Sequence, residues 1–144
     1  MLKEATLQEV KKVADLALRL WSNHTLEELN QEITHVISQP DSKIILSYHA
    51  NEVIGFAQCQ LRYDYVEGTS SSPVGYLEGL FVKEEFRKQD VARSLVSTCE
   101  EWAKEKGCRE FASDCELENV ESLVMHQKLG FGEANRIICF KKDL

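Results

Sequence analysis

The sequence has few residues that break or cross-link a chain, and it has no long apolar run. Two prolines and seven glycines in 144 residues leave no linker, repeat or low-complexity segment. No apolar stretch approaches the length of a transmembrane helix, and the first residues, MLKEATLQEV, become charged too soon for a signal peptide. We therefore expect a cytoplasmic protein with one globular domain over residues 1–144 and no membrane contact.

The cysteines and the charges exclude further classes of protein. The five cysteines are odd in number, widely spaced and without a C-x-x-C pair, which argues against a disulfide framework and a zinc site. We expect free cysteines that pack in the core, and no metal. The formal net charge is −7, from 24 acidic and 17 basic side chains. Because such a field repels nucleic acid and attracts cations, we expect no nucleic-acid partner.

The order of predicted elements indicates a mixed α/β fold. Two capping boxes, T-L-Q-E from Thr6 and T-L-E-E from Thr25, each begin a helix with an apolar stripe, and Pro40 ends the second helix. The predicted strands lie at 1–4, 43–49, 53–65, 75–82, 110–115 and 136–142, with a further short one if GFGE (130–133) forms a separate strand. The later helices are predicted over 91–106 and 119–129. This order predicts one strand–helix–strand crossover in the second half of the chain.

The strand at 75–82 carries an unexpected glutamate and leads into a basic turn. An unpaired carboxylate is costly to bury, so Glu78 needs a compensating partner. The turn R-K-Q-D-V-A lies at the entrance of the next helix, where free backbone N–H groups and the helix dipole attract anions. Arg87 and Lys88 add two positive charges there. Taken alone, a basic dipeptide before a helix is more often a solvated surface turn.

Two segments resemble motifs of the GNAT superfamily of N-acetyltransferases. V-x-E-x-F-R-K-Q-D-V-A resembles Q/R-x-x-G-x-G/A, and E-N-V-E-S-L-V-M-H-Q-K-L-G-F resembles N-x-x-A-x-x-x-Y-x-x-x-G-F. The resemblance implies a mostly antiparallel sheet with a splayed central strand pair, about four flanking helices, and acetyl-coenzyme A as cosubstrate. It implies that the strand end, the turn and one asparagine bind this cosubstrate: Leu80, Phe81, Val82, Arg87, Lys88, Gln89, Asp90, Val91, Ala92 and Asn119.

Two positions depart from the superfamily pattern. Asp90 replaces the first glycine of the turn, and its charge would face the pyrophosphate if the side chain pointed inward. Aspartate nevertheless adopts the left-handed backbone conformation more readily than most residues. His126 occupies the position where the superfamily often has the tyrosine that protonates the departing thiolate. The resemblance therefore implies a catalytic role for His126, and an ordinary packed or exposed histidine is the alternative.

A narrower resemblance connects the chain with the aminoglycoside 6'-N-acetyltransferases. It is carried by L-W-S-N, D-Y-V-E-G-T-S-S-S-P-V-G-Y-L-E-G and F-A-S-D. It implies that four side chains line an antibiotic pocket: Trp21, Tyr65, Glu78 and Asp114. Asn135 is a further candidate at the border of this pocket. Glu78 would then face a cationic amine. The resemblance also implies a homodimer, with residues 131–142 at its interface.

These residue types suit acetyl transfer to a polycationic sugar. Carboxylates hold ammonium groups, and aromatic faces pack on sugar rings and cations. We expect direct attack by the 6'-amine, whose proton leaves through Glu78 or Asp114, while a strand amide near Leu80 receives the carbonyl oxygen. Two alternatives stay open: a GNAT enzyme for a polyamine, peptide or small metabolite amine, and a non-catalytic acyl-coenzyme A binding module. For single residues, Trp21 as core filler and Asp114 as a turn residue are the simpler interpretations.

Overall fold

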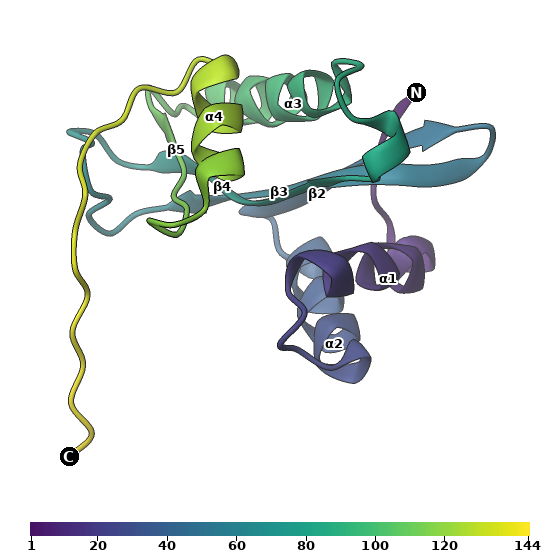
Figure 1. Cartoon of the computed structure of the whole chain (residues 1–144), viewed down its shortest axis with the longest axis horizontal. Helices are drawn as coiled ribbons and strands as arrows, with labels where there is room; N and C mark the ends of the chain where they lie inside the picture. The colour runs from purple at the N-terminus through teal and green to yellow at the C-terminus, as the bar shows by residue number, and fades with distance from the viewer.

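The computed structural model describes residues 1–144 as a five-stranded sheet with helices on both faces (Figure 1). The strands lie side by side in sequence order: β1 (Leu2–Glu4), β2 (Ser42–His49), β3 (Glu52–Arg62), β4 (Val74–Val82) and β5 (Phe111–Ala112). The first four strands are antiparallel neighbours, and only β4 and β5 pair in parallel. Helix α3 (Val91–Glu105) connects β4 to β5, so the predicted crossover and the mixed α/β class are confirmed.

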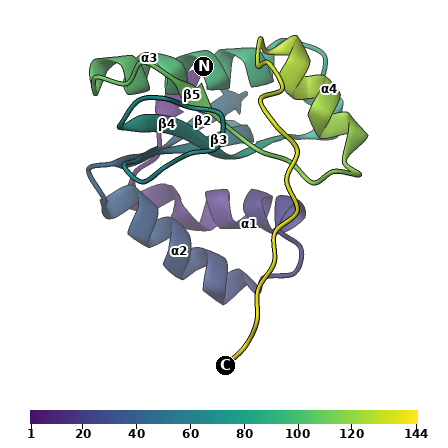
Figure 2. The same ribbon diagram turned by 90° about the vertical axis from the view of Figure 1, so that its left-hand side faces the viewer.

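Two pairs of helices form the outer layers. Helices α1 (Val10–Leu20) and α2 (Leu26–Ser38) cover one face of the sheet, and α3 and α4 (Val120–Lys128) cover the other (Figures 1 and 2). The capping box at the start of α2 is present as predicted, because Glu28 N donates to Thr25 Oγ1 at 3.1 Å and Thr25 N donates to Glu28 Oε1 at 2.9 Å. The helices therefore begin where the sequence places them.

The central strands are apolar because both of their faces are buried. Phe56 of β3 packs with Leu29 of α2 on one face of the sheet. Leu77 of β4 packs with Leu95 and Trp102 of α3 on the other. Strands covered on both sides read as nearly continuous hydrophobic runs, which explains the apolar density of β3 and β4.

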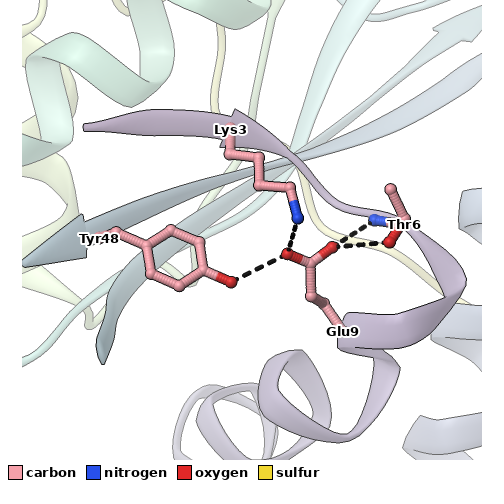
Figure 3. A network of polar contacts seen from close by, with 4 residues as sticks. All are labelled: Lys3, Thr6, Glu9 and Tyr48. Atoms are coloured by element: carbon pink, nitrogen blue, oxygen red, sulfur yellow. Dashed lines mark hydrogen bonds and ion pairs between the residues drawn. The ribbon is translucent and has the colours of Figure 1, made fainter. Parts of the chain in front are cut away.

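A buried carboxylate connects β1, β2 and the start of α1 (Figure 3). Glu9, almost inaccessible to solvent, ends a short 3-10 helix at Leu7–Glu9. Its Oε1 accepts hydrogen bonds from Thr6 N at 2.7 Å and Thr6 Oγ1 at 2.9 Å, and its Oε2 accepts one from the Tyr48 hydroxyl at 2.9 Å and one from the Lys3 ammonium. The polar groups that folding buries here are thus satisfied.

The prediction of a last strand at 136–142 is wrong for this structure, as is a short strand at GFGE. After α4 the chain leaves the sheet as an extended tail (Figures 1 and 2), so its backbone groups face no neighbouring strand. The predicted strand at 110–115 keeps only the two residues of β5, because it pairs with β4 at Gly75 and Tyr76 alone. The alternating apolar residues of the tail stay exposed, at 62% for Ile137, 80% for Ile138 and 91% for Phe140.

The cysteines are free, and only some of them pack in the core. Cys59, Cys99 and Cys108 are buried, as predicted, between the sheet and α3. The prediction is wrong for Cys115 and Cys139, which are exposed because they lie after β5 and in the extended tail. None of the helices combines the length and the apolar character that crossing a membrane requires.

Candidate active site

The candidate site begins at a bulge in β4. Gln58 of β3 pairs with Gly79, and the next residue, Cys59, pairs with Leu77, so Glu78 is the extra residue of β4. A bulge interrupts side-chain alternation and leaves the extra residue without a ladder partner. Leu77 consequently packs toward α3, whereas Glu78 and Gly79 both face the α1–α2 side. The bulge explains how an otherwise apolar strand presents a carboxylate outside the core.

Arg62 of β3 is the partner that offsets the burial of Glu78. Its Nε lies 3.0 Å from Oε2 and its Nη2 lies 2.9 Å from Oε1, and the Glu78 side chain is 18% exposed. The guanidinium also stacks on the Tyr76 ring, 3.4 Å from the ring centroid. The inference that burial of Glu78 demands a substrate amine is therefore wrong, because the chain supplies its own cation. Sequence reasoning missed Arg62 because the long loop between β3 and β4 hides their register.

The surroundings of Glu78 raise its affinity for a proton. Burial raises the pKa of Glu78 above its usual range; Arg62 lowers it by less, and nearby Asp114 raises it further. Asp114 accepts a hydrogen bond from the Tyr76 hydroxyl, and burial together with this bond raises the pKa of Tyr76. Tyr76 and Arg62 thus connect the two predicted catalytic carboxylates.

Beside Glu78 lies a cavity of about 580 Å³ between the sheet and α2. Nine residues line it: Trp21, His24, Gln31, Glu32, Ile33, His35, Val36, Gln58 and Glu78. The ring centroids of Trp21 and Phe56 are 6.1 Å apart. A Cβ added at Gly79 would lie 2.6 Å from the Trp21 ring. The absence of a side chain at Gly79 therefore lets the indole approach β4 closely, next to Glu78. The α2 residues were missed because a polar helix face gives no periodic apolar signal.

The other predicted substrate residues lie outside this cavity. Asp114 follows β5 and reaches the site through Tyr76. Tyr65 is exposed in the loop between β3 and β4. Asn135, in the tail, donates from Nδ2 to Glu67 Oε1 of that loop at 2.5 Å. The structure thus brings Trp21 and Glu78 together in the cavity. Tyr65 lies in the loop between β3 and β4, and Asn135 lies in the tail, which contacts that loop at Glu67.

The basic turn lies between the end of β4 and α3. Asp90 precedes α3 in the left-handed conformation, with φ 63° and ψ 14°, as its tolerance of that region suggested. Its exposed side chain points to Arg93, 3.7 Å from Oδ1 to Nε. Arg87 donates from Nε to the Val82 carbonyl at 2.8 Å, which ties the turn to the strand end. Lys88 also has a positive φ of 63°.

The remaining predicted cofactor residues flank this turn. Leu80 is half-buried toward α3 and Phe81 packs toward α1 and α2. Val82 is buried. Val91 and Ala92, the first residues of α3, pack against the core, and the Gln89 side chain donates to the Glu85 carbonyl at 3.3 Å. Asn119 caps α4 by accepting a hydrogen bond from Ser122 N at 3.1 Å. These residues thus lie at the end of β4, in the turn before α3, and at the starts of α3 and α4.

His126 of α4 is hydrogen-bonded on both ring nitrogens. Nδ1 lies 2.7 Å from the Ser122 carbonyl oxygen, and Nε2 lies 2.8 Å from Ser113 Oγ. Because a carbonyl oxygen only accepts, Nδ1 carries a proton. In the neutral ring Nε2 accepts from the Ser113 hydroxyl; in the doubly protonated ring Nε2 donates to Ser113 Oγ, and the hydroxyl then donates to the Leu77 carbonyl at 3.3 Å. Ser113 adjoins Asp114, so this contact brings His126 to the place where β4 and β5 separate. The sequence analysis did not identify Ser113.

Strands β4 and β5 separate just after their two paired positions. No pairing follows Tyr76 and Ala112, so the predicted splayed pair is present, although β5 lies at the edge of the sheet and not at its centre. The splay, the bulge in β4 and the turn at the start of α3 lie along one strand. Together they mark the end of β4 as the candidate ligand-binding site.

Comparison with known proteins places the chain in a family. The model of the acetyltransferase (GNAT) family matches residues 10–131. The aminoglycoside N(6')-acetyltransferase type 1 of Acinetobacter baumannii is 44% identical over 132 residues, covering 90% of each chain. The chain therefore belongs to the acetyltransferase (GNAT) family and, within it, to the family of the aminoglycoside N(6')-acetyltransferases.

Solved structures agree with this assignment. The crystal structure of the aminoglycoside 6'-N-acetyltransferase AAC(6')-Ih from Acinetobacter baumannii has a TM-score of 0.95 at 38% identity, covering 100% of this chain and 98% of that one. AAC(6')-Iy in complex with the bisubstrate analogue CoA-S-monomethyl-acetylneamine has a TM-score of 0.95 at 33% identity, with the same coverage.

Proposed function

We propose that this protein transfers the acetyl group of acetyl-coenzyme A to the 6'-amino group of aminoglycoside antibiotics and thereby confers resistance. The observation that carries the proposal is the cavity in which Trp21 and Glu78 lie together beside the splayed end of β4. An aromatic face and a carboxylate are what a cationic amino sugar requires. The relatives named above support the choice of substrate.

The residues present fit acetyl-coenzyme A, which supplies an activated thioester. The turn after β4 presents the N-terminus of α3, a 15-residue helix, with Arg87 beside it. Free amides and the helix dipole suit a pyrophosphate. Asp90 turns its carboxylate toward Arg93, so it does not oppose that anion from within the turn. We assign the pantetheine arm to the strand end at Leu80 to Val82 and to Asn119.

The reaction follows from the groups around the splay. The neutral 6'-amine attacks the thioester carbon, the C–S bond breaks, and the amine proton passes to Glu78, whose raised pKa suits a general base. Because β5 pairs with β4 only at Gly75 and Tyr76, the β5 side of β4 has no strand partner near Leu80, and we assign a β4 amide there to receive the carbonyl oxygen. We assign Asp114 to binding an ammonium group. We assign the proton of the departing thiolate to doubly protonated His126, whose Nε2–H donates to Ser113 Oγ as the Ser113 hydroxyl gives its proton to the sulfur.

The tail and the fold suggest how the protein is organised. We propose a homodimer joined through residues 131–142, because the tail exposes apolar side chains that have no partner in one chain. We also take residues 1–144 as a single domain, because both helical layers pack on one sheet. The cytoplasmic location stays a prediction from the sequence.

A thiol-release assay tests the proposed function. The enzyme with acetyl-coenzyme A should release free thiol with kanamycin or tobramycin and should not do so with spermidine. Mass spectrometry should find one added acetyl group, located on the 6'-amine. Release with spermidine alone would assign the enzyme to polyamines. Tight acetyl-coenzyme A binding without release across the amine panel would identify a binding module.

A further inference from the structure

The cavity has a wall that the chemistry above does not use. The sheet contributes Gln58 and Glu78, and α2 with the loop before it contributes the opposite side. Gln31 and His35, and likewise Glu32 and Val36, are four residues apart, so they share a face of α2. Gln31, Glu32 and His35 of α2 therefore give this wall of the cavity a polar lining.

Glu32 is the carboxylate of this wall that no lysine or arginine neutralises. Its Oε1 lies 3.9 Å from His24 Nδ1, which is its one ionic partner and is charged only when protonated. Glu78, by contrast, is paired with Arg62. The lining contains no lysine or arginine. A cation in the cavity therefore finds one carboxylate that no lysine or arginine neutralises, Glu32, in addition to the Arg62-paired Glu78.

We propose that Glu32 is a second anchor of the acceptor site, which binds an ammonium group on an aminoglycoside ring other than the one that carries the 6'-amine. The inference rests on the proposed function. A cavity of about 580 Å³ has the size of a drug-like ligand site. With the reacting ring between Trp21 and Glu78, the rest of a polycationic antibiotic extends along α2. Glu32 then sets affinity and antibiotic preference without touching the reacting atoms.

Matched variants on one helix test the proposal. Glu32→Gln removes the charge and Glu32→Lys reverses it, while Glu27→Gln and Glu27→Lys make the same changes at an exposed position of α2 outside the cavity. Because the Glu32 side chain is 58% exposed, Glu32→Gln should raise KM for kanamycin about two- to five-fold, the range of an exposed ion pair. Glu32→Lys should raise it about ten-fold or more. The kcat and the KM for acetyl-coenzyme A should stay as in the wild type.

The outcomes separate this proposal from the proposed function. An equal rise in KM for the Glu27 variants would show a general surface field and overturn the anchor. An unchanged KM in Glu32→Lys, or a loss confined to kcat, would overturn it too. Wild-type enzyme that releases no thiol with any aminoglycoside would instead defeat the proposed function, and the anchor with it. Thermal unfolding of all four variants checks that the fold is intact.

Discussion

At the scale of single residues, Glu78 carries the proposed proton transfer. Glu78→Gln keeps the shape and one of the two hydrogen bonds from Arg62 but cannot accept a proton, so kcat should fall about 10²-fold. Because burial raises its pKa, wild-type kcat/KM should decline on acidification at a pH above the ordinary range of glutamate. The variant should lack this acid limb and lose less activity as free amine becomes abundant. Profiles with kanamycin from about pH 6 to 9 measure both effects; unchanged kcat and KM would make Glu78 structural.

Asp114 should act on binding where Glu78 acts on turnover. Asp114→Asn keeps an acceptor for the Tyr76 hydroxyl but removes the charge that we assign to an ammonium group. A charge-assisted contact is worth about 1.5–3 kcal/mol, so KM for the antibiotic should rise about ten- to a hundred-fold. The kcat should change little. Steady-state kinetics of Asp114→Asn and Glu78→Gln, measured side by side, test whether Asp114 acts in binding and Glu78 in proton transfer. If Asp114→Asn lost as much kcat as Glu78→Gln, the assignment of Asp114 to binding alone would be wrong.

Gly79 positions Trp21 by having no side chain. In Gly79→Ala, the new Cβ would lie 2.6 Å from the indole, so the ring must move away from β4 and from Glu78. Losing an aromatic contact to a cation should raise antibiotic KM about two- to five-fold. Tryptophan fluorescence should report the altered environment of Trp21. Gly132→Ala is the control, because nothing lies within 4 Å of its Cβ position; an equal change there would refute the argument.

At the scale of elements, the turn before α3 carries two charged residues with different proposed roles, Arg87 and Asp90. Arg87→Ala removes a cation from the proposed pyrophosphate site and should raise KM for acetyl-coenzyme A much more than KM for the antibiotic. Asp90→Gly should leave that KM unchanged or lower, because glycine accepts the positive φ and the lost carboxylate faces Arg93. Steady-state kinetics measure both KM values, and titration calorimetry measures acetyl-coenzyme A binding to each variant. Equal effects of Arg87→Ala on the two substrates, or lost binding in Asp90→Gly, would contradict the placement.

The junction of β1, β2 and α1 depends on an ionised Glu9. Burial raises its pKa, but hydrogen bonds from Lys3, Thr6 and Tyr48 outweigh this and hold the pKa at about 2, below 4.5. Its stabilisation is therefore complete above about pH 4.5 and is lost as the pH falls toward 2. Glu9→Gln should lower the free energy of unfolding by on the order of 2–3 kcal/mol at pH 7 and by less at pH 3.5. Urea unfolding at both values tests this, with Glu27→Gln as control; a pH-independent difference would exclude the ionic origin.

The sequence predicted the helices well because their signals are local. Capping boxes and apolar stripes define α1 and α2 without reference to the rest of the chain. The bulge at Glu78 and the shortness of β5 depend on pairing between distant strands, which no local pattern records. In the site, Trp21 and Glu78 were found through the family resemblance. Arg62 and Glu32 were missed because one depends on strand register and the other lies on the polar face of a helix.

At the scale of the whole molecule, the tail decides whether one chain is the working unit. The sequence predicted a strand at 136–142 from its alternation, and the single chain offers that segment no partner. Ile138 and Phe140 are at least four-fifths exposed. Burying each such side chain is worth about 1.5–3 kcal/mol, and an extended segment with free backbone groups pairs readily with another sheet edge. We propose that a second copy of the chain supplies both the apolar cover and the edge.

We therefore expect a dimer of about 33 kDa, twice the chain mass of 16.5 kDa, by light scattering at micromolar concentration. Ile138→Lys combined with Phe140→Asp should shift the mass toward one chain, because each change places a charge where the interface is apolar. Lys11→Asp, a charge reversal at an exposed position of α1 outside the tail, is the control and should stay dimeric. A wild-type mass of one chain would refute the dimer. A double variant that stays fully dimeric would place the interface elsewhere on the molecule, away from the tail.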